Sequence, residues 1–331
     1  MRRMFVFFIL SAVTCMVTSF NKPLNNNKPP KLRTIIIDPG HGGFDPGTHG
    51  LISKEKDVAL EISLKLGEAL KKEFPDLKIV FTRTTDEMVG GGETIGEGLR
   101  NRAAIANKAK GDLFICIHAN SNGKPPGGYY AKRVIGHRKK MEYVGKGKKR
   151  HKKLVNAPIY ESYWVKNEVV GTASYIWKAD RAGFKSQAIN EKDEGSAVEG
   201  GGGDEINDST TAAVEFDMTS PEAQIRAQLY EKMFFNNSAF FGQLVQEEFQ
   251  KAGRETEGVL QRDKGIQVLQ ATGMPSVLIE TGFLTNKEEE EYLNSEKGQA
   301  EVVQNIVDAF RRYRDAIEGG SSVNQQSSGG R

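Results

Sequence analysis

The chain has 331 residues, of which 38% are hydrophobic and 27% are charged, with a net charge of +3. This length suits one large domain or two modest ones, and the hydrophobic fraction excludes a disordered chain. Its 2 Cys residues are too few for a scaffold built on disulfides or a zinc module built on cysteines.

The N-terminal segment predicts export. Arg2 and Arg3 precede the apolar run Met4–Val17, which is too short to span a bilayer as a helix. The small and β-branched residues at positions 17–19 are typical of a signal-peptidase site. We therefore expect a signal peptide over residues 1–19, a linker over 20–31, and a periplasmic or cell-envelope location.

Lipidation at Cys15 is the less favoured alternative, because Thr14 is a poor residue to precede a lipobox cysteine. After cleavage Cys116 would be the one remaining cysteine, so no disulfide is expected within the mature chain.

Strands and helices alternate in the first part of the chain. Apolar, β-branched runs predict strands, and apolar residues at helical spacing predict amphipathic helices. The predicted strands are Leu32–Asp38, Leu77–Arg83 and Leu113–Asn120, and the predicted helices are Asp57–Lys72 and Leu99–Ala109.

The alternation resumes after an interruption. We expect a helix from Ser220 towards Phe249, strands at Gly265–Leu269 and Ser276–Phe283, and a final helix at Glu296–Glu318. Residues 319–331 are rich in Gly, Ser and Gln and are expected to be a disordered tail. The pattern predicts an α/β domain over 32–318, with a single twisted, mostly parallel sheet covered by helices on both faces.

The interruption predicts a large insert at about 131–240. Within it Lys132–Lys153 carries eleven Lys/Arg and one acid, Glu142, so this run has a charge of +10 and the rest of the chain −7. Such a run is typical of a solvated loop, and in an exported protein it could contact an anionic envelope surface. Nucleic acid is not expected as a partner, because the run holds few aromatic residues and an exported protein does not share a compartment with nucleic acid.

Two of the five histidines follow apolar strands. His41 comes after TIIIDPG, and His118 lies at the end of LFICIH. Ligands gather at the carboxyl ends of strands in an open α/β sheet, so these two imidazoles can converge. His137 and His151 lie in the basic run and are expected to be solvated, and His49 lies in a Gly-rich loop.

A hydrolytic zinc site needs three protein ligands, and two His with one carboxylate form a common set. The carboxylates between the two histidines are Asp45, Glu55, Asp57 and Glu61. Glu55 is the best placed because it opens the first predicted helix, but spacing alone does not choose it over Asp57.

Glu280 is the other notable carboxylate, because it interrupts the apolar strand SVLIETGF. A buried acid is costly unless it is paired or functional. It is therefore either a member of a core ion pair or a general base beside a metal-bound water. The sequence holds no HExxH, GxSxG or GxGxxG motif and no phosphate-binding GK[ST], which removes several competing chemistries.

Five segments in order, IIIDPGHGGFDPG, KEKDVAL, LRNRAAIAN, IHANS and MPSVLIETGFLTN, resemble the zinc-dependent N-acetylmuramoyl-L-alanine amidases of the AmiC/CwlV type (Amidase_3). The resemblance covers Arg33–Tyr130 and Phe241–Arg314. It implies zinc ligands at His41, Glu55 and His118, and Glu280 as the catalytic acid/base. It also implies cleavage of the peptidoglycan amide between N-acetylmuramic acid and L-alanine.

Lys264 departs from the family pattern, in which Arg usually precedes that glycine. Some relatives carry, at the position of the insert, a helix that covers the zinc cleft until an activator protein displaces it. An autoinhibitory insert is therefore a hypothesis for this chain. The alternative functions are a zinc hydrolase of another amide or peptide, and an inactive wall-binding regulator.

Overall fold

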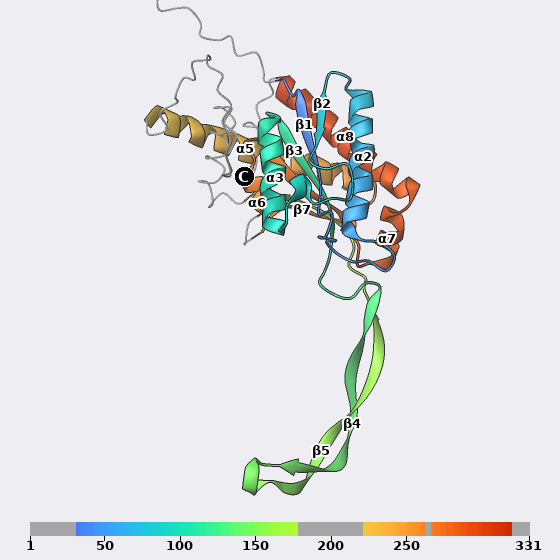
Figure 1. Cartoon of the computed structure of the whole chain (residues 1–331). Helices are drawn as coiled ribbons and strands as arrows, with labels where there is room; N and C mark the ends of the chain where they lie inside the picture. Colours follow the sequence, from blue (N-terminus) through green and yellow to red (C-terminus); the bar gives the residue numbers. More distant parts are fainter. Residues whose placement is uncertain (1–30, 178–220, 263–265, 320–331) are drawn as a thin grey trace, which may run out of the picture.

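The computed structural model describes residues 31–177, 221–262 and 266–319, without the side chains of 221–224. The predicted signal peptide, the linker up to residue 30, Ser220, Lys264 and the tail beyond residue 319 lie outside these ranges. Within them the chain forms a six-stranded sheet between helices and a separate two-stranded hairpin (Figure 1). The sheet strands, in spatial order, are β2 (Lys78–Phe81), β1 (Thr34–Pro39), β3 (Leu113–Asn120), β8 (Ser276–Phe283), β6 (Thr172–Ile176) and β7 (Thr256–Gln261).

The sheet is mostly parallel, as predicted. β2, β1, β3 and β8 run in one direction, whereas β6 pairs antiparallel with β8 and carries β7 parallel to itself. The register sets His118 of β3 beside Glu280 of β8. Two of the residues that the sequence singled out are thus neighbours at the carboxyl edge of the central strands.

Helices cover both faces of the sheet, which confirms the predicted fold class. The described helices are α2 (Glu55–Glu73), α3 (Ile95–Lys108), α5 (Pro221–Lys251), α6 (Gln267–Ala271), α7 (Lys287–Leu293) and α8 (Glu296–Glu318), with 3-10 turns η1 (Val89–Gly91) and η2 (Gly147–Lys149).

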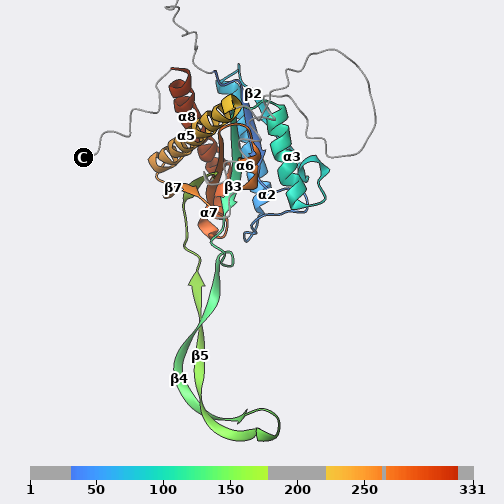
Figure 2. The ribbon, with the colours of Figure 1, turned by 90° about the vertical axis from the view of Figure 1, so that its left-hand side faces the viewer.

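The alternation of side chains along β1 divides the core into two clusters. Ile35 and Ile37 pack with the apolar residues of α2, α5 and α8, including the fully buried Phe310. Ile36 points to the other face, where it packs with Ala106 of α3 and Leu269 of α6. Figure 2 shows α3 on one side of the molecule and α5 with α8 on the other.

The helices begin where their sequences favour it. Thr94 caps α3 in a capping box, because its side chain accepts from the Glu97 backbone while the Glu97 carboxylate accepts from the Thr94 backbone. α2 has Glu55 and Asp57 in its first turn, where carboxylates interact favourably with the helix dipole. Glu55 therefore lies at the N-terminus of α2, next to the edge of the sheet.

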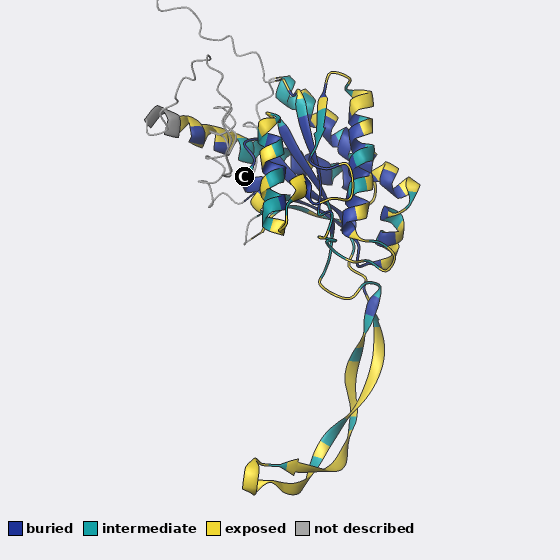
Figure 3. Cartoon of the chain, viewed as in Figure 1, coloured by how far each residue is buried: buried dark blue, intermediate teal, exposed yellow. Residues whose placement is uncertain are grey.

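The basic run is a β-hairpin rather than the solvated loop that its charge suggested. β4 (Gly128–Val144) pairs antiparallel with β5 (His151–Lys166). The hairpin extends away from the domain, and most of its residues are exposed (Figures 1 and 3).

The predicted insert boundaries of about 131–240 are wrong. β6 is a strand of the main sheet, and α5 packs on it through residues such as Phe241 and Phe249. The sequence pattern did not predict β6, because TASYI is a short run with small and polar residues. Of the described part of the predicted insert, the hairpin alone stands apart from the domain.

The predicted strand Gly265–Leu269 is also wrong, since Gln267–Ala271 forms the short helix α6. Val268 and Leu269 are buried against the second core cluster. A short apolar run can form either a buried strand or a buried helix. The packing of the run in the core, and not its local sequence pattern, decides which of the two it forms. In the part of the chain that the structure describes, every helix is too short or too polar to cross a membrane.

Candidate active site

His41 lies in a tight loop directly after β1, and its backbone has φ 57°. A positive φ is uncommon for a residue with a side chain and concentrates at functional sites. Two buried arginines hold this loop: Arg83 donates to the carbonyl of Gly40 at 2.7 Å, and Arg102 donates to the carbonyls of Pro39 and His41. The surrounding hydrogen bonds therefore stabilise the strained conformation.

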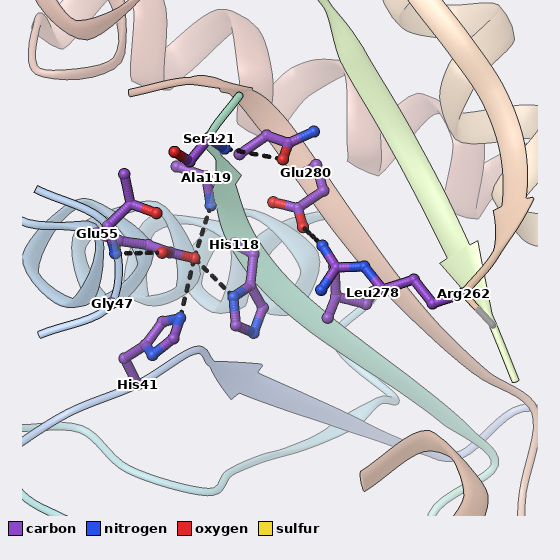
Figure 4. A pocket seen from close by; sticks show the side chains of 11 residues that line it. His41, Gly47, Glu55, His118, Ala119, Ser121, Arg262, Leu278 and Glu280 are labelled. Atoms are coloured by element: carbon purple, nitrogen blue, oxygen red, sulfur yellow. Dashed lines mark hydrogen bonds and ion pairs between the residues drawn. The ribbon is translucent and has the colours of Figure 1, made fainter. Parts of the chain in front are cut away.

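The side chains of His41, Glu55 and His118 converge although they come from three separate segments. Their ligand atoms all lie within 4.8 Å of one another. Glu55 Oε1 lies 3.1 Å from His41 Nε2 and 2.7 Å from His118 Nδ1 (Figure 4). Two imidazoles and a carboxylate around one point form a donor set that suits Zn²⁺.

Further contacts fix the orientation of these groups. Asp45 Oδ2 lies 2.8 Å from His41 Nδ1, so the other ring nitrogen of His41 faces Glu55. The backbone N–H of Thr48 donates to the Glu55 carboxylate at 2.8 Å. A carboxylate that accepts from one ring nitrogen of a histidine fixes the tautomer and orientation of a ring whose other nitrogen binds a metal.

Two glycines leave room for the cluster. A Cβ at Gly40 would lie 2.5 Å from the ring of His118, and a Cβ at Gly47 would lie 2.6 Å from Glu55 Oε2. No other residue fits at either position without displacing a member of the cluster.

The charges in the cluster support one another. Burial alone would raise the pKa of Glu55, but hydrogen bonds from His118 and His41 lower it well below its usual range. Burial alone would lower the pKa of His41, but hydrogen bonds and attraction from Glu55 and Asp45 raise it. The Glu55 carboxylate is therefore ionised near neutral pH.

Glu280 of β8 lines the same pocket as His41, Glu55 and His118, and it is 3% exposed. Burial raises its pKa to about 7, which suits a group that both accepts and donates a proton near neutral pH. Arg262 donates to Glu280 Oε1 at 3.2 Å (Figure 4), whereas Glu280 Oε2 has no hydrogen-bond partner among the residues that the structure describes. A buried carboxylate oxygen without a partner is available to a water or a substrate.

These residues line a pocket of about 330 Å³ at the carboxyl ends of β3 and β8. Thr48, Asn120, Ser121 and Arg262 complete its wall. Such a pocket, with converging polar groups and a carboxyl group of raised pKa, has the features of an active site.

The structure selects among the carboxylates that the spacing left open. Glu55 enters the cluster, and Asp45 supports His41. Asp57 and Glu61 are exposed on α2, and Glu61 instead accepts from Gln299 at 2.7 Å.

The structure separates the other histidines from the pocket. His49, His137 and His151 are exposed, and none of them lines it. Cys116 is buried and free, as expected.

Arg262 is the functional residue that sequence reasoning missed. The family pattern marks the position of Lys264 instead, and Lys264 lies outside the described residues. The ion pair considered for Glu280 was the available signal, because a nearby cation stabilises a buried carboxylate.

Comparison with known proteins identifies relatives of this chain. The family model Amidase_3, described as N-acetylmuramoyl-L-alanine amidase, matches residues 35–312. The chain is 26% identical over 281 residues to N-acetylmuramoyl-L-alanine amidase AmiC of Escherichia coli, covering 84% of this chain and 52% of that relative. It thus spans about half the length of that protein. It is also 39% identical over 89 residues to the sporulation-specific N-acetylmuramoyl-L-alanine amidase of Bacillus subtilis, covering 27% of this chain and 32% of that relative.

The fold is similar to solved structures. The N-acetylmuramoyl-L-alanine amidase from Clostridium difficile 630 matches with a TM-score of 0.51 at 22% identity, covering 87% of this chain and 99% of that one. The CwlD amidase from Clostridioides difficile, solved in complex with the GerS lipoprotein, matches with a TM-score of 0.51 at 21% identity, covering 85% and 98%. At these identities the likeness supports the fold.

Proposed function

Since the chain belongs to the N-acetylmuramoyl-L-alanine amidase family Amidase_3, we propose that it hydrolyses the amide between N-acetylmuramic acid and L-alanine in peptidoglycan. The observation that carries this proposal is the cluster of His41, Glu55 and His118 beside the buried Glu280. This arrangement has the groups that metal-assisted amide hydrolysis requires.

We propose that His41, Glu55 and His118 hold Zn²⁺. The nitrogen and oxygen donors favour zinc over magnesium or calcium, which prefer oxygen ligands alone. Asp45 behind His41, and the glycines that make room for the rings, also fit a metal centre. When bound, the ion polarises the scissile carbonyl and lowers the pKa of a coordinated water.

In the proposed reaction Glu280 moves the proton. Its carboxylate takes a proton from the attacking water and returns it to the departing L-alanine nitrogen. Arg262 donates to Oε1 at 3.2 Å, so Oε2, which has no hydrogen-bond partner in the described part of the chain, is the oxygen left to accept the proton. Arg262 is therefore a positioning residue; it lines the pocket, and half of its side chain is exposed to solvent.

The decisive experiment digests purified peptidoglycan and measures product masses. Stem peptides with a free L-alanine amino terminus identify an amidase, whereas other cleavage products would indicate a zinc hydrolase of another amide or peptide. Absence of products, with retained binding to sacculi, would indicate the inactive wall-binding regulator.

Two variants separate metal binding from proton transfer. His118→Ala should lose zinc, as measured by elemental analysis. Glu280→Gln should retain zinc but lose turnover by about 10²–10⁴-fold. Glu61→Gln, an exposed carboxylate on α2, is the matched control, and full activity of Glu280→Gln would remove Glu280 from this role.

We further propose that the protein is exported to the periplasm or cell envelope. This rests on the apolar N-terminal segment Met4–Val17 and on a substrate that lies outside the cytoplasm. Mass spectrometry of the secreted form would test cleavage after residue 19 and distinguish it from lipidation at Cys15.

Regulation by an insert also stays a proposal. The hairpin points away from the domain (Figure 1), so a restraint on the pocket would have to come from residues 178–220, which lie outside the described ranges. The CwlD amidase was solved in complex with the GerS lipoprotein, which supports the proposal that a partner protein acts on this chain as an activator. Replacing residues 179–219 by a Gly/Ser linker keeps β6 and α5 and should raise activity, whereas unchanged activity in a folded variant would argue against the restraint.

A further inference from the structure

The β4–β5 hairpin has an uncovered apolar face. Its two strands pair only with each other among the described residues, and they extend well beyond the domain (Figures 1 and 2). A two-stranded hairpin without a further layer is marginally stable in water.

The strand register gathers most of the large exposed apolar side chains of the hairpin on one face, whereas Ile159 and Tyr163 lie on the other. Side chains alternate along a strand, so Leu154, Tyr160 and Trp164 of β5 point the same way. Their partners across the hairpin are Met141, Val134 and Tyr130. The rings of Tyr130 and Trp164 lie 5.1 Å apart, as expected for a cross-strand pair on one face.

A β-bulge keeps the apolar residues on either side of it on the same face, with the polar residues Lys132, His137 and Lys139 and their partners between them. The register shifts between Val134 and Gly136, which leaves Ile135 as the extra residue of β4. Beyond the bulge the odd-numbered residues of β4 lie on the apolar face, which brings Met141 opposite Leu154 and adds Tyr143. The resulting apolar stripe consists of Tyr130, Val134, Met141, Tyr143, Leu154, Tyr160 and Trp164, each more than half exposed.

Dense positive charge surrounds the apolar stripe. Residues 128–166 contain twelve Lys/Arg and two acids, Glu142 and Glu161. Near the hairpin tip the cations of Arg150 and Lys152 lie 4.6 and 5.4 Å from the ring centre of Tyr143. The hairpin therefore combines aromatic, aliphatic and cationic groups on a projecting arm.

We propose that this hairpin docks the protein, apolar stripe first, on the surface of an anionic phospholipid membrane. Lys and Arg attract anionic headgroups, and Trp and Tyr favour the interface between headgroups and acyl chains. Long cationic side chains can reach the headgroups while their neighbours lie deeper. Large apolar side chains that are more than half exposed and gather on one face of a projecting arm indicate an interaction site.

The aliphatic residues favour a membrane over an anionic wall polymer. A polyanionic polymer remains hydrated, so contact with it would leave Val134, Met141 and Leu154 in water. The acyl region of a bilayer removes these side chains from water, which contributes free energy in proportion to the area buried. Charge alone fits both partners, but the apolar stripe fits the bilayer.

The root of the hairpin joins this surface to the pocket. Asn120 and Ser121 line the pocket, and β4 begins a few residues later at Gly128. Gly127 at the root donates to the carbonyl of Thr285 at 3.0 Å, which anchors the hairpin to the segment after β8. Since β4 has 17 residues, the docked arm would hold the pocket within about 55 Å of the membrane.

The test uses tryptophan fluorescence of the full chain with vesicles of phosphatidylcholine alone or with one quarter phosphatidylglycerol. The chain has 2 Trp, of which Trp177 is buried and Trp164 is exposed. We expect binding and a blue shift of Trp164 emission with the anionic vesicles only, and weaker binding at high salt. Trp164→Phe should abolish the shift, which separates hairpin docking from any binding by the N-terminal apolar segment.

Matched variants test each part of the proposal. Leu154→Thr on the apolar stripe should weaken binding about tenfold, whereas Ile159→Thr on the opposite face should not. Alanine at Lys148, Lys149 and Lys153 should weaken it on the order of a hundredfold, at about fivefold per lysine. Alanine at Lys72, Lys108 and Lys297 changes the net charge equally but lies on the domain, and should leave binding intact.

Three results would overturn the proposal: equal binding to neutral and anionic vesicles, an unshifted Trp164 spectrum, or Leu154→Thr behaving as wild type. Binding to anionic wall polymer without any vesicle-induced shift would identify the polymer as the occupant and also reject the membrane. Hydrolysis of soluble peptidoglycan fragments by each variant checks folding, because the hairpin side chains lie outside the pocket.

Discussion

Glu290 on α7 stabilises the loop that precedes Glu55. Its buried carboxylate accepts from the backbone N–H groups of Leu51, Ile52 and Ser53 at 2.7–2.8 Å and from the Ser53 hydroxyl at 2.8 Å. Gly50 packs so closely that a Cβ there would lie 2.1 Å from Glu290 Oε1. We predict that Glu290→Ala destabilises the protein and loosens the metal site.

The magnitude follows from these four bonds. A hydrogen bond to a charged group contributes about 1.5–3 kcal/mol, and an unsatisfied buried donor costs about 1–3 kcal/mol. The side chains of Leu51 and Ile52 are exposed, so water can reach part of the freed backbone and the loss falls well below the sum. We therefore expect the free energy of unfolding to fall by about 3–4 kcal/mol for Glu290→Ala and by about half as much for Glu290→Gln, which retains one acceptor oxygen.

Urea denaturation followed by circular dichroism measures this loss, and zinc titration of the folded variant measures the effect on the site. Glu291→Ala is the control, since this neighbouring side chain is exposed and has only a 3.7 Å ion pair with Lys287. Its removal should cost less than about 0.5 kcal/mol. If Glu290→Ala were no less stable than Glu291→Ala, the loop would not depend on this carboxylate.

Two further substitutions test the packing of the site. Gly47→Ala should lower zinc affinity by about 10–100-fold, because its Cβ would press on Glu55. The control is Gly123→Ala, which has a similar φ of +70° but open space around the position of the new Cβ, and it should leave zinc titration unchanged. Equal effects of the two variants would indicate backbone strain alone. Arg102→Met should cost about 3–5 kcal/mol in urea denaturation because it removes the cation that lies 2.5 Å from the buried Asp38 carboxylate and leaves Asp38 only its bonds from Thr82 and Cys116 among the described residues. A loss below 1 kcal/mol would show that this ion pair is not required.

Much of the fold could be predicted from the sequence because its central strands are buried on both faces. β3 and β8 have the predicted bounds, since uninterrupted apolar runs are a local property of such strands. The edge strand β7 (TEGVLQ) is only half-buried and has a mixed sequence, so no comparable signal marks it.

The sequence by itself determined which chemistry was available: histidines directly after or at the end of buried strands, a carboxylate at a helix start, and an acid inside an apolar strand. These are local facts, fixed by residues near one another along the chain. Local spacing left the choice between Glu55 and Asp57 open, and the family resemblance pointed to Glu55 before the tertiary structure placed it beside the imidazoles. Only the tertiary structure decided that Arg262 contacts Glu280 and that the basic run is a projecting hairpin. Those outcomes depend on register and on contacts between distant segments, which no local pattern of residues encodes.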